Sequence, residues 1–386
     1  MDFSFTEEQQ MIRDTAEAFL ADVSSSEAVR RAMALEQGYE DKIWARICGE
    51  MYWQAIHIPE QYGGMGLGYV ELVSLFEQMG RYLLCSPFLS TVGYGVNALL
   101  VAGTEAQQAT YLPQIAEGSL TATLAHTGTN GRFDAAGVQA TWRKDGDQLL
   151  LNGCLRFVAD GHSADLLIIA AREEGSEAED GISLFVVPAQ TDGVQREWLP
   201  TMDQTRKQAQ INLDQVSLPL GSVMQSAGEA WPLLSRIIDL ATIAVAAEQM
   251  GGGQQILDMT VEYTKERVQF NRPIAGFQAV KHIAADMMLK SEVSRSAIYY
   301  AACVANEALT GGPLAGELGE AASVAKAYCS EAYFDNAGDA MQLHGGVGFT
   351  WEYDVHLYFK RAKSSGLLLG NAPYHRERIA KLLLDS

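Results

Sequence analysis

Two short segments in the last third of the sequence carry residues suited to binding a phosphorylated ligand. Arg267 follows an amphipathic helical pattern, and its guanidinium fork matches a pair of phosphate oxygens. Gln342 precedes the pair Gly345 and Gly346, and glycine lets the backbone approach a phosphate that a Cβ would keep away. Each signal alone is weak, because an arginine late in a helix is often solvated and a glycine pair is often only a turn. The interpretation therefore depends on the elements that carry these residues.

The sequence predicts helices, then strands, then helices. Thr6 and Gln9 form a capping-box pattern before apolar residues at helical spacing, which continue to about residue 116. Helical periodicity returns at about residue 227, with Ile256, Met259 and Tyr263 on one face. Between these regions, turn residues separate short β-type runs, a spacing typical of a small sandwich or barrel. The predicted strands are 121–125, 138–142, 149–151, 166–170, 182–187 and 211–213.

Composition excludes several classes of protein. The 386 residues include 28 Lys and Arg against 48 Asp and Glu, a net charge of −20, which argues against a nucleic-acid partner. No run approaches the roughly 18 consecutive apolar residues of a membrane span, so we expect no membrane partner. The five cysteines are scattered, without the spacing of a metal site, and the start lacks a signal-peptide pattern. These features predict a cytoplasmic protein without a metal site.

The order of elements and several strings along the whole chain resemble the acyl-CoA dehydrogenase family. The string IPEQYGGMG at 58–66 is similar to a family segment near the N-terminus. The most specific strings are RVQFNRPI at 267–274, FQAVKH at 277–282 and QLHGGVGF at 342–349. The resemblance implies a multidomain α+β fold with an N-terminal α-helical domain (1–117), a middle β-barrel or sandwich domain (118–226) and a C-terminal four-helix bundle (227–386).

The resemblance also implies the reaction. Members of the family bind FAD, remove two hydrogens across Cα–Cβ of an acyl-CoA thioester and pass electrons to an electron-transferring flavoprotein. The α-proton of a thioester is only weakly acidic, so a carboxylate base with a raised pKa must lie beside it. Hydrogen bonds to the thioester oxygen stabilise the developing charge, while the flavin accepts the hydride.

The family motifs assign FAD contacts to particular residues of this chain. By resemblance, Arg267 reaches the diphosphate of an FAD held mainly by a neighbouring subunit, and Phe270 and Gln278 hold its adenosine half. Gln342, Gly345 and Gly346 correspond to the loop that approaches the diphosphate. Two histidines in this region, His344 and His356, are interpreted as structural.

Both usual positions of the catalytic base are empty. Carrying the family pattern forward from Arg361 places Leu369 where most members have a glutamate, and counting back from Arg267 places Ala241 at the alternative position. Neither side chain accepts a proton. Glu248 is a candidate for a displaced base, because it lies near two turns beyond Ala241, roughly 10 Å along the helix axis. A buried, paired glutamate is the competing interpretation.

The strings that hold the flavin ring in the family also differ here. The first is replaced by AHTGTNGR at 125–132, in which Arg132 stands where a small residue normally lines the acyl-CoA site. The second is replaced by FVAD at 157–160, so Ala159 lacks the hydroxyl that bonds near flavin N5.

The chain thus keeps the diphosphate-binding set and lacks much of the ring-binding and catalytic set. One hypothesis is that it completes an FAD site in trans, within a heterotetramer containing two copies of this chain and two of a homologous catalytic subunit. Its ending resembles the non-catalytic chains of bacterial enzymes acting on steroid side-chain CoA thioesters. Two alternatives stay open: a homotetrameric dehydrogenase that uses Glu248, and a non-enzymatic scaffold or binding subunit.

Overall fold

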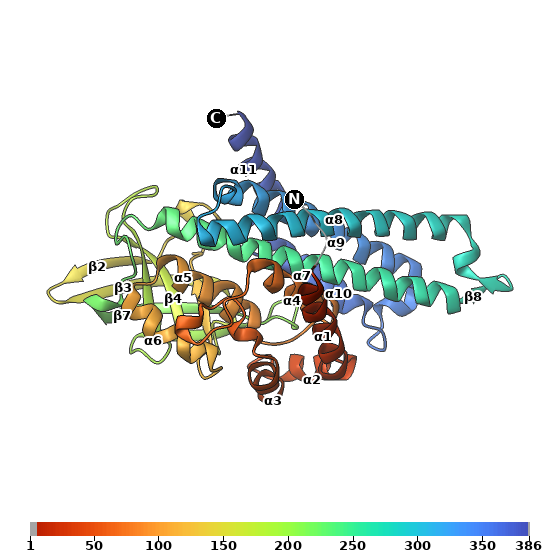
Figure 1. Cartoon of the computed structure of the whole chain (residues 1–386), viewed down its shortest axis with the longest axis horizontal. Coiled ribbons are helices and arrows are strands. Elements are labelled where there is room, and N and C mark those ends of the chain that lie inside the picture. The colour runs from red at the N-terminus through yellow and green to blue at the C-terminus, as the bar shows by residue number, and fades with distance from the viewer. Residues whose placement is uncertain (1–5, 385–386) are drawn as a thin grey trace. The chain divides into compact units, whose positions relative to one another are not determined.

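The computed structural model describes residues 6–384 and has the predicted order of elements (Figure 1). Helices occupy the chain as far as Ala116, strands extend from Ala122 to Pro219, and helices return at Trp231. This confirms the α+β fold with an N-terminal helical region, a middle β region and a C-terminal helical region. Among the described helices, none is both long and apolar enough to cross a membrane.

The chain divides into two compact units by its internal contacts. The first contains the described residues up to Arg31, Gly68–Leu84 and those from Thr242 onward, and the second contains Ala32–Leu67 and Cys85–Ala241. The predicted domain ranges follow element order along the chain, whereas these units follow spatial contacts. The first unit therefore joins segments from both ends of the sequence.

The first unit is helical. The capping box predicted before its first helix is present, since the Gln9 backbone N–H donates to Thr6 Oγ1 (3.2 Å) and the Thr6 N–H donates to Gln9 Oε1 (3.1 Å). Helix α9 contacts α8, α10 and α11, and α4 contacts α1 and α8. The elements are α1 (Glu7–Val23), α2 (Ser26–Ala34, across the unit boundary), α4 (Tyr69–Arg81), α7 (Trp231–Glu266, also across it), β8 (Val268–Gln269), β9 (Arg272–Pro273), α8 (Gln278–Thr310), α9 (Leu318–His344), α10 (Val355–Leu367) and α11 (Ala372–Leu384).

The second unit contains one seven-stranded mixed sheet. Its order is β1-β4-β2-β3-β7-β6, with β5 also paired to β4; β1 and β2 run parallel to β4, and the other pairs are antiparallel. The strands are β1 (Ala122–Ala125), β2 (Thr141–Asp145), β3 (Gln148–Ala159), β4 (Leu166–Glu173), β5 (Ile182–Pro188), β6 (Val194–Leu199) and β7 (Gln208–Pro219). Helices α3 (Asp41–Arg46), α5 (Asn97–Ala102) and α6 (Glu105–Ala116) complete the unit.

Two strand predictions were wrong in detail. The run 138–142 does not form a strand before Thr141, because Ala135–Gly137 form a 3-10 turn that delays the start of β2. The strand β6 was missed, because its inward and outward residues alternate without the continuous apolar run of the core strands. Register shifts within β3, between Leu151 and Gly153 and between Leu155 and Val158, mark β-bulges that let a twelve-residue strand bend.

Close contact between α7 and α4 depends on two glycines. A Cβ on Gly251 of α7 would overlap the carbonyl oxygen of Glu77 in α4, and a Cβ on Gly80 of α4 would overlap the carbonyl oxygen of Glu248 in α7. Glycine lowers the stability of an isolated helix, so its presence in two helix interiors reflects the packing. The backbones of α7 and α4 lie so close together at positions 251 and 80 that only glycine fits there.

A neighbouring glycine lets a side chain of α9 pack on α7. A Cβ on Gly252 would lie 2.5 Å from the Tyr333 ring, and the Asn336 side-chain amide donates to the Gly253 carbonyl (3.4 Å) and to the Met287 carbonyl of α8 (3.1 Å). Three consecutive glycines thus place α7 between α4 and α9.

We expect Gly251→Ala to lower the free energy of unfolding by about 3 kcal/mol, because the added methyl group forces the α4 backbone away. Gly338→Ala is the matched control: Gly338 lies inside α9, and an added Cβ there meets nothing within 4 Å. That control should gain up to about 1 kcal/mol from helix propensity. Urea unfolding of both variants measures the difference, and equal effects would contradict the packing argument.

Candidate functional site

A cleft of about 420 Å³ opens in the helical unit where α7 and α9 end. The end of α7 and the β8–β9 hairpin form one wall, and the end of α9 with the following turn forms the other. The structure therefore brings together four residues predicted from the sequence to bind FAD. The lining residues are Tyr263, Arg267, Gln269, Ile274, Gln342, Leu343, His344, Gly345, Gly346, Val347 and Thr350.

The glycine turn is built to leave its backbone open. Helix α9 ends at His344, and Gly345 follows with φ 61° and ψ −142°, a conformation that is essentially restricted to glycine. The 3-10 helix Gly345–Phe349 continues from it. A Cβ on Gly345 or Gly346 would meet nothing within 4 Å in the described part of the chain. Packing within the chain does not explain the glycine at 346, whereas close approach of an external group does.

Arg267 is exposed directly after the end of α7. Its backbone N–H donates to the Tyr263 carbonyl (2.9 Å), and its own carbonyl accepts from the Ile274 N–H (2.8 Å). Both bonds fix the backbone, so the guanidinium is directed from a rigid base. Within residues 6–384, no carboxylate lies within ion-pairing distance of this guanidinium. Its charge is therefore available to an anionic ligand.

Phe270 and Gln278 lie beside the cleft and do not line it. Phe270 occupies the β8–β9 turn with φ 51° and is 86% exposed, the highest exposure of any large apolar side chain among the described residues. Its ring lies 6.0 Å from that of Phe277, edge to face, while the Arg272 guanidinium lies 4.0 Å from the centre of the Phe277 ring. Gln278 is exposed at the first turn of α8.

The sequence-based prediction missed Tyr263, Ile274 and Thr350 as parts of this cleft. Tyr263 was placed on the apolar face of its helix, and its position four residues before Arg267 was the available signal, because residues i and i+4 share a helix face. Ile274 and Thr350 reach the cleft through the hairpin and the turn after α9, which carry no periodic pattern. Among the described residues, no cluster of three or more His, Cys, Asp or Glu could hold a metal ion.

Ala241 and Leu369, which the sequence analysis assigned to the two base positions, are apolar and buried. Ala241 is fully buried in α7. Leu369 follows α10 with φ 56° and is 6% exposed. Its carbonyl is 3.0 Å from His375 Nε2, and burial lowers the pKa of His375 to about 3, so that imidazole is neutral. Because that nitrogen is beside a carbonyl acceptor, it carries the ring proton.

Glu248 forms an ion pair inside the helical unit. Its Oε2 lies 3.8 Å from Arg361 Nη1 of α10, and both side chains are almost completely buried. Removing one partner of such a pair leaves an uncompensated charge in a dry environment. The geometry supports the structural interpretation of Glu248; its candidacy as a base stays a prediction.

We expect Glu248→Ala to lower the free energy of unfolding by about 3 kcal/mol, because Arg361 then keeps its buried charge without the carboxylate. The double variant Glu248→Leu, Arg361→Leu should recover much of that loss, and the double-mutant cycle measures the coupling by urea unfolding. A Glu248→Ala protein as stable as the wild type but without turnover would instead identify Glu248 as the base.

A fully buried lysine holds the segment that contains Leu369. Lys326 of α9 donates to the Gly370 carbonyl (3.0 Å), the Gly366 carbonyl (3.3 Å) and Ser330 Oγ (3.1 Å). Burial lowers the pKa of the Lys326 amine to about 7. These bonds satisfy carbonyls at the end of α10 that have no partner within the helix. Sequence analysis gave no sign of this role, because a lysine in a helical pattern is normally solvated.

The depressed pKa of Lys326 predicts a pH-dependent stability. The pKa of the Lys326 amine is about 7 in the folded chain, against an ordinary value of 10.5 that applies to the unfolded chain. Between pH 7 and 10.5 the unfolded chain therefore binds more protons than the folded chain. The contribution of Lys326 to the free energy of unfolding therefore rises with pH across that window. Urea unfolding from pH 6.5 to 9.5 should show wild type gaining stability relative to Lys326→Met. Lys381→Met, which changes an exposed lysine of α11, should follow the wild type at every pH.

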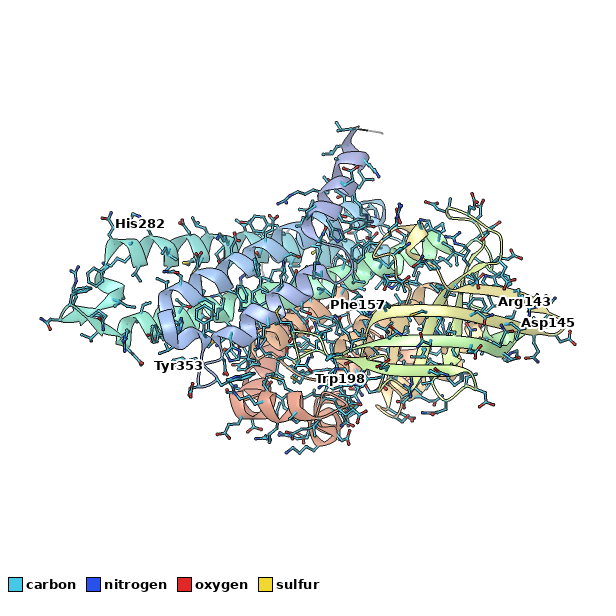
Figure 2. All side chains as sticks on the ribbon, turned by 180° about the vertical axis from the view of Figure 1, so that it is seen from behind. Arg143, Asp145, Phe157, Trp198, His282 and Tyr353 are labelled. Carbon is cyan, nitrogen blue, oxygen red and sulfur yellow. The ribbon has the colours of Figure 1, made fainter. Side chains whose placement is uncertain are left out.

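In the sheet unit, the segments 125–132 and 157–160, which the sequence analysis compared with flavin-ring motifs, lie close together: the Arg156 N–H donates to the Thr127 carbonyl (2.9 Å). Figure 2 shows Phe157 near the end of the sheet opposite to Arg143 and Asp145. Ala159 is buried, and Ser90 Oγ donates to Asp160 Oδ2 (2.6 Å). Burial lowers the pKa of His126 to about 4. Arg132 is exposed and paired with Asp134, so its charge is balanced within this unit.

Comparison with known proteins decides the family. Acyl-CoA dehydrogenase domains match the chain in three successive parts: the N-terminal domain over residues 6–119, the middle domain over 123–216 and the C-terminal domain over 228–384. Acyl-CoA dehydrogenase IpdE2 of Mycolicibacterium smegmatis is 32% identical, across 98% of both chains. The chain belongs to the acyl-CoA dehydrogenase family. It is accordingly a flavin-dependent oxidoreductase of the class that acts on CH–CH bonds.

Two solved structures are similar over nearly the whole chain. The ChsE4-ChsE5 complex from Mycobacterium tuberculosis contains a chain with a TM-score of 0.87 and 27% identity, with full coverage of both chains. A Tcur3481-Tcur3483 steroid ACAD gives a TM-score of 0.86 at 29% identity, with 98% of each chain covered.

Proposed function

We propose that this acyl-CoA dehydrogenase chain is the FAD-completing subunit of a heteromeric enzyme. The observation that carries the proposal is the cleft at the ends of α7 and α9, in which Arg267, Gln342 and the Gly345–Gly346 turn come together. An unpaired guanidinium and an open glycine backbone fit a diphosphate. Phe270, exposed beside the cleft, offers an aromatic ring to the adenosine half of FAD.

The residues of this chain would hold and orient the cofactor. Arg267 would donate hydrogen bonds to the diphosphate, and the backbone N–H groups of the glycine turn would approach it without steric hindrance. Bound FAD would supply the hydride acceptor for desaturation of the acyl-CoA thioester. By holding the diphosphate and adenosine half of FAD, this chain would fix where the flavin ring lies.

The catalytic base would come from a homologous partner subunit. Leu369 and Ala241 occupy the two family positions for this carboxylate, and both are buried hydrocarbon side chains. Neither accepts a proton, so proton abstraction at Cα requires a carboxylate from elsewhere. Glu248 is held by Arg361, which supports a partner as the source of the base.

Exposed apolar side chains on the helical unit support an oligomer. They lie at helical spacing on the neighbouring helices α8 and α9, and a partner helix would remove them from water. The likeness to a chain of the ChsE4-ChsE5 complex supports assembly with a second, different subunit. An electron-transferring flavoprotein would take the electrons from the proposed enzyme. These side chains are Met288, Leu289, Val293, Val324 and Tyr328.

The proposed substrate is an acyl-CoA with a bulky, steroid-type acyl group. Its support is the likeness to the Tcur3481-Tcur3483 steroid ACAD over 98% of the chain, together with the C-terminal ending described above. If the substrate pockets of this chain and its partner were merged into one, such an acyl group would have more space.

The decisive measurement is the ratio of FAD to polypeptide in the purified chain, alone and co-expressed with a base-containing homologue. We expect little FAD alone and one FAD per two chains in an active mixed tetramer. Arg267→Ala should weaken FAD binding by this assembly at least about tenfold, because charge-assisted hydrogen bonds are lost. Arg143→Ala, which changes an arginine of strand β2 that does not line the cleft, is the matched control and should bind FAD like wild type.

One FAD per chain and turnover by a homotetramer would overturn trans completion and direct mutagenesis to Glu248. Negligible FAD under every condition would favour the scaffold or binding subunit.

A further inference from the structure

Two aromatic rings that line the cleft are stacked on each other. The rings of Tyr263 and His344 are 4.2 Å apart and inclined by only 18°, and both residues line the cleft. Tyr353 contacts both of them, with ring centres 6.2 Å away and steep interplanar angles of 88° to Tyr263 and 70° to His344. Three aromatic side chains from α7, α9 and the segment before α10 therefore form one cluster.

Hydrogen bonds join this cluster to both walls. The Tyr263 hydroxyl donates to the His344 carbonyl (3.3 Å), and His344 Nδ1 is 2.8 Å from the Ala340 carbonyl. The Tyr263 carbonyl accepts from the Arg267 N–H (2.9 Å). Tyr263 is thus bonded at its backbone to the arginine wall and at its hydroxyl to the residue that precedes Gly345.

The tautomer of His344 follows from this geometry. Because Nδ1 is beside a carbonyl acceptor, Nδ1 carries the proton, and burial lowers the pKa of the ring so that it is neutral near pH 7. A neutral ring can stack on Tyr263 without a charge to solvate. His344 was interpreted from the sequence as structural, and here it shapes the helix end that carries the glycine turn.

We propose that Tyr263 is a positioning residue that sets the separation of Arg267 from the Gly345–Gly346 turn, so that both walls bind one diphosphate together. The hydroxyl bond and the ring stack connect the ends of α7 and α9, which are otherwise separate segments of the chain. A ligand held by two walls pays less entropy when their separation is already fixed. This inference rests on the proposed FAD-binding function.

The experiment measures the FAD dissociation constant by fluorescence, in the full assembly after flavin removal. Tyr263→Phe keeps the stack and loses the hydroxyl bond, so we expect FAD binding about fivefold weaker. Tyr263→Leu also loses the stack, and a further factor of about five should follow. Tyr300→Phe is the matched control, because it removes a hydroxyl bonded to Glu317 elsewhere in the same helical unit; its FAD affinity should equal that of wild type.

A double-mutant cycle separates positioning from general destabilisation. If Tyr263 acts by placing Arg267 against the turn, Tyr263→Phe should have little effect on FAD affinity once Arg267 is alanine. An equal effect in both backgrounds, or wild-type affinity in Tyr263→Phe, would overturn the positioning role while Arg267→Ala still weakens binding. Failure of Arg267→Ala to weaken binding would instead overturn the FAD-binding function itself. Thermal unfolding of each variant verifies that it is folded.

Discussion

The close packing of α7 against α4 and α9 is the constraint on which the helical unit depends. Gly251 and Gly80 let α7 and α4 approach until their backbones touch, whereas Gly252 makes room for the side-chain ring of Tyr333 of α9. Contacts of this kind have little freedom to adjust, because backbone atoms cannot change rotamer as side chains do. The crossing of α7 and α4 is therefore fixed near the middle of α7, and the Tyr333 ring of α9 packs on α7 at the same level.

The cleft follows from that constraint. Two helices held together at their centres end at a definite separation, and the β8–β9 hairpin and the glycine turn begin at those ends. Arg267 and Gly345 are 78 positions apart in sequence and still face one ligand-sized space. The glycine contacts near the middle of α7 set the approximate separation of the two helix ends. The stacked rings of Tyr263 and His344 then fix that separation locally.

The sequence predicted the parts of this structure that have local signals. Short patterns of a few residues predicted the capping box at Thr6, the order of elements and the choice of Arg267 and Gly345 as candidate site residues, which now line one cleft. Lys326 and Tyr263 were not predicted as structural links, because their roles depend on partners across other helices. The strand β6 was missed for a related reason: its pairing with β7, rather than its own composition, makes it a strand.

Two hydrogen bonds at the turn of Leu369 are accepted by its main-chain carbonyls. Lys326 binds the Gly370 carbonyl and His375 contacts the Leu369 carbonyl, so neither bond involves the side chain at position 369. A substitution at position 369 would therefore leave both of these hydrogen bonds in place and change only how the buried side chain packs.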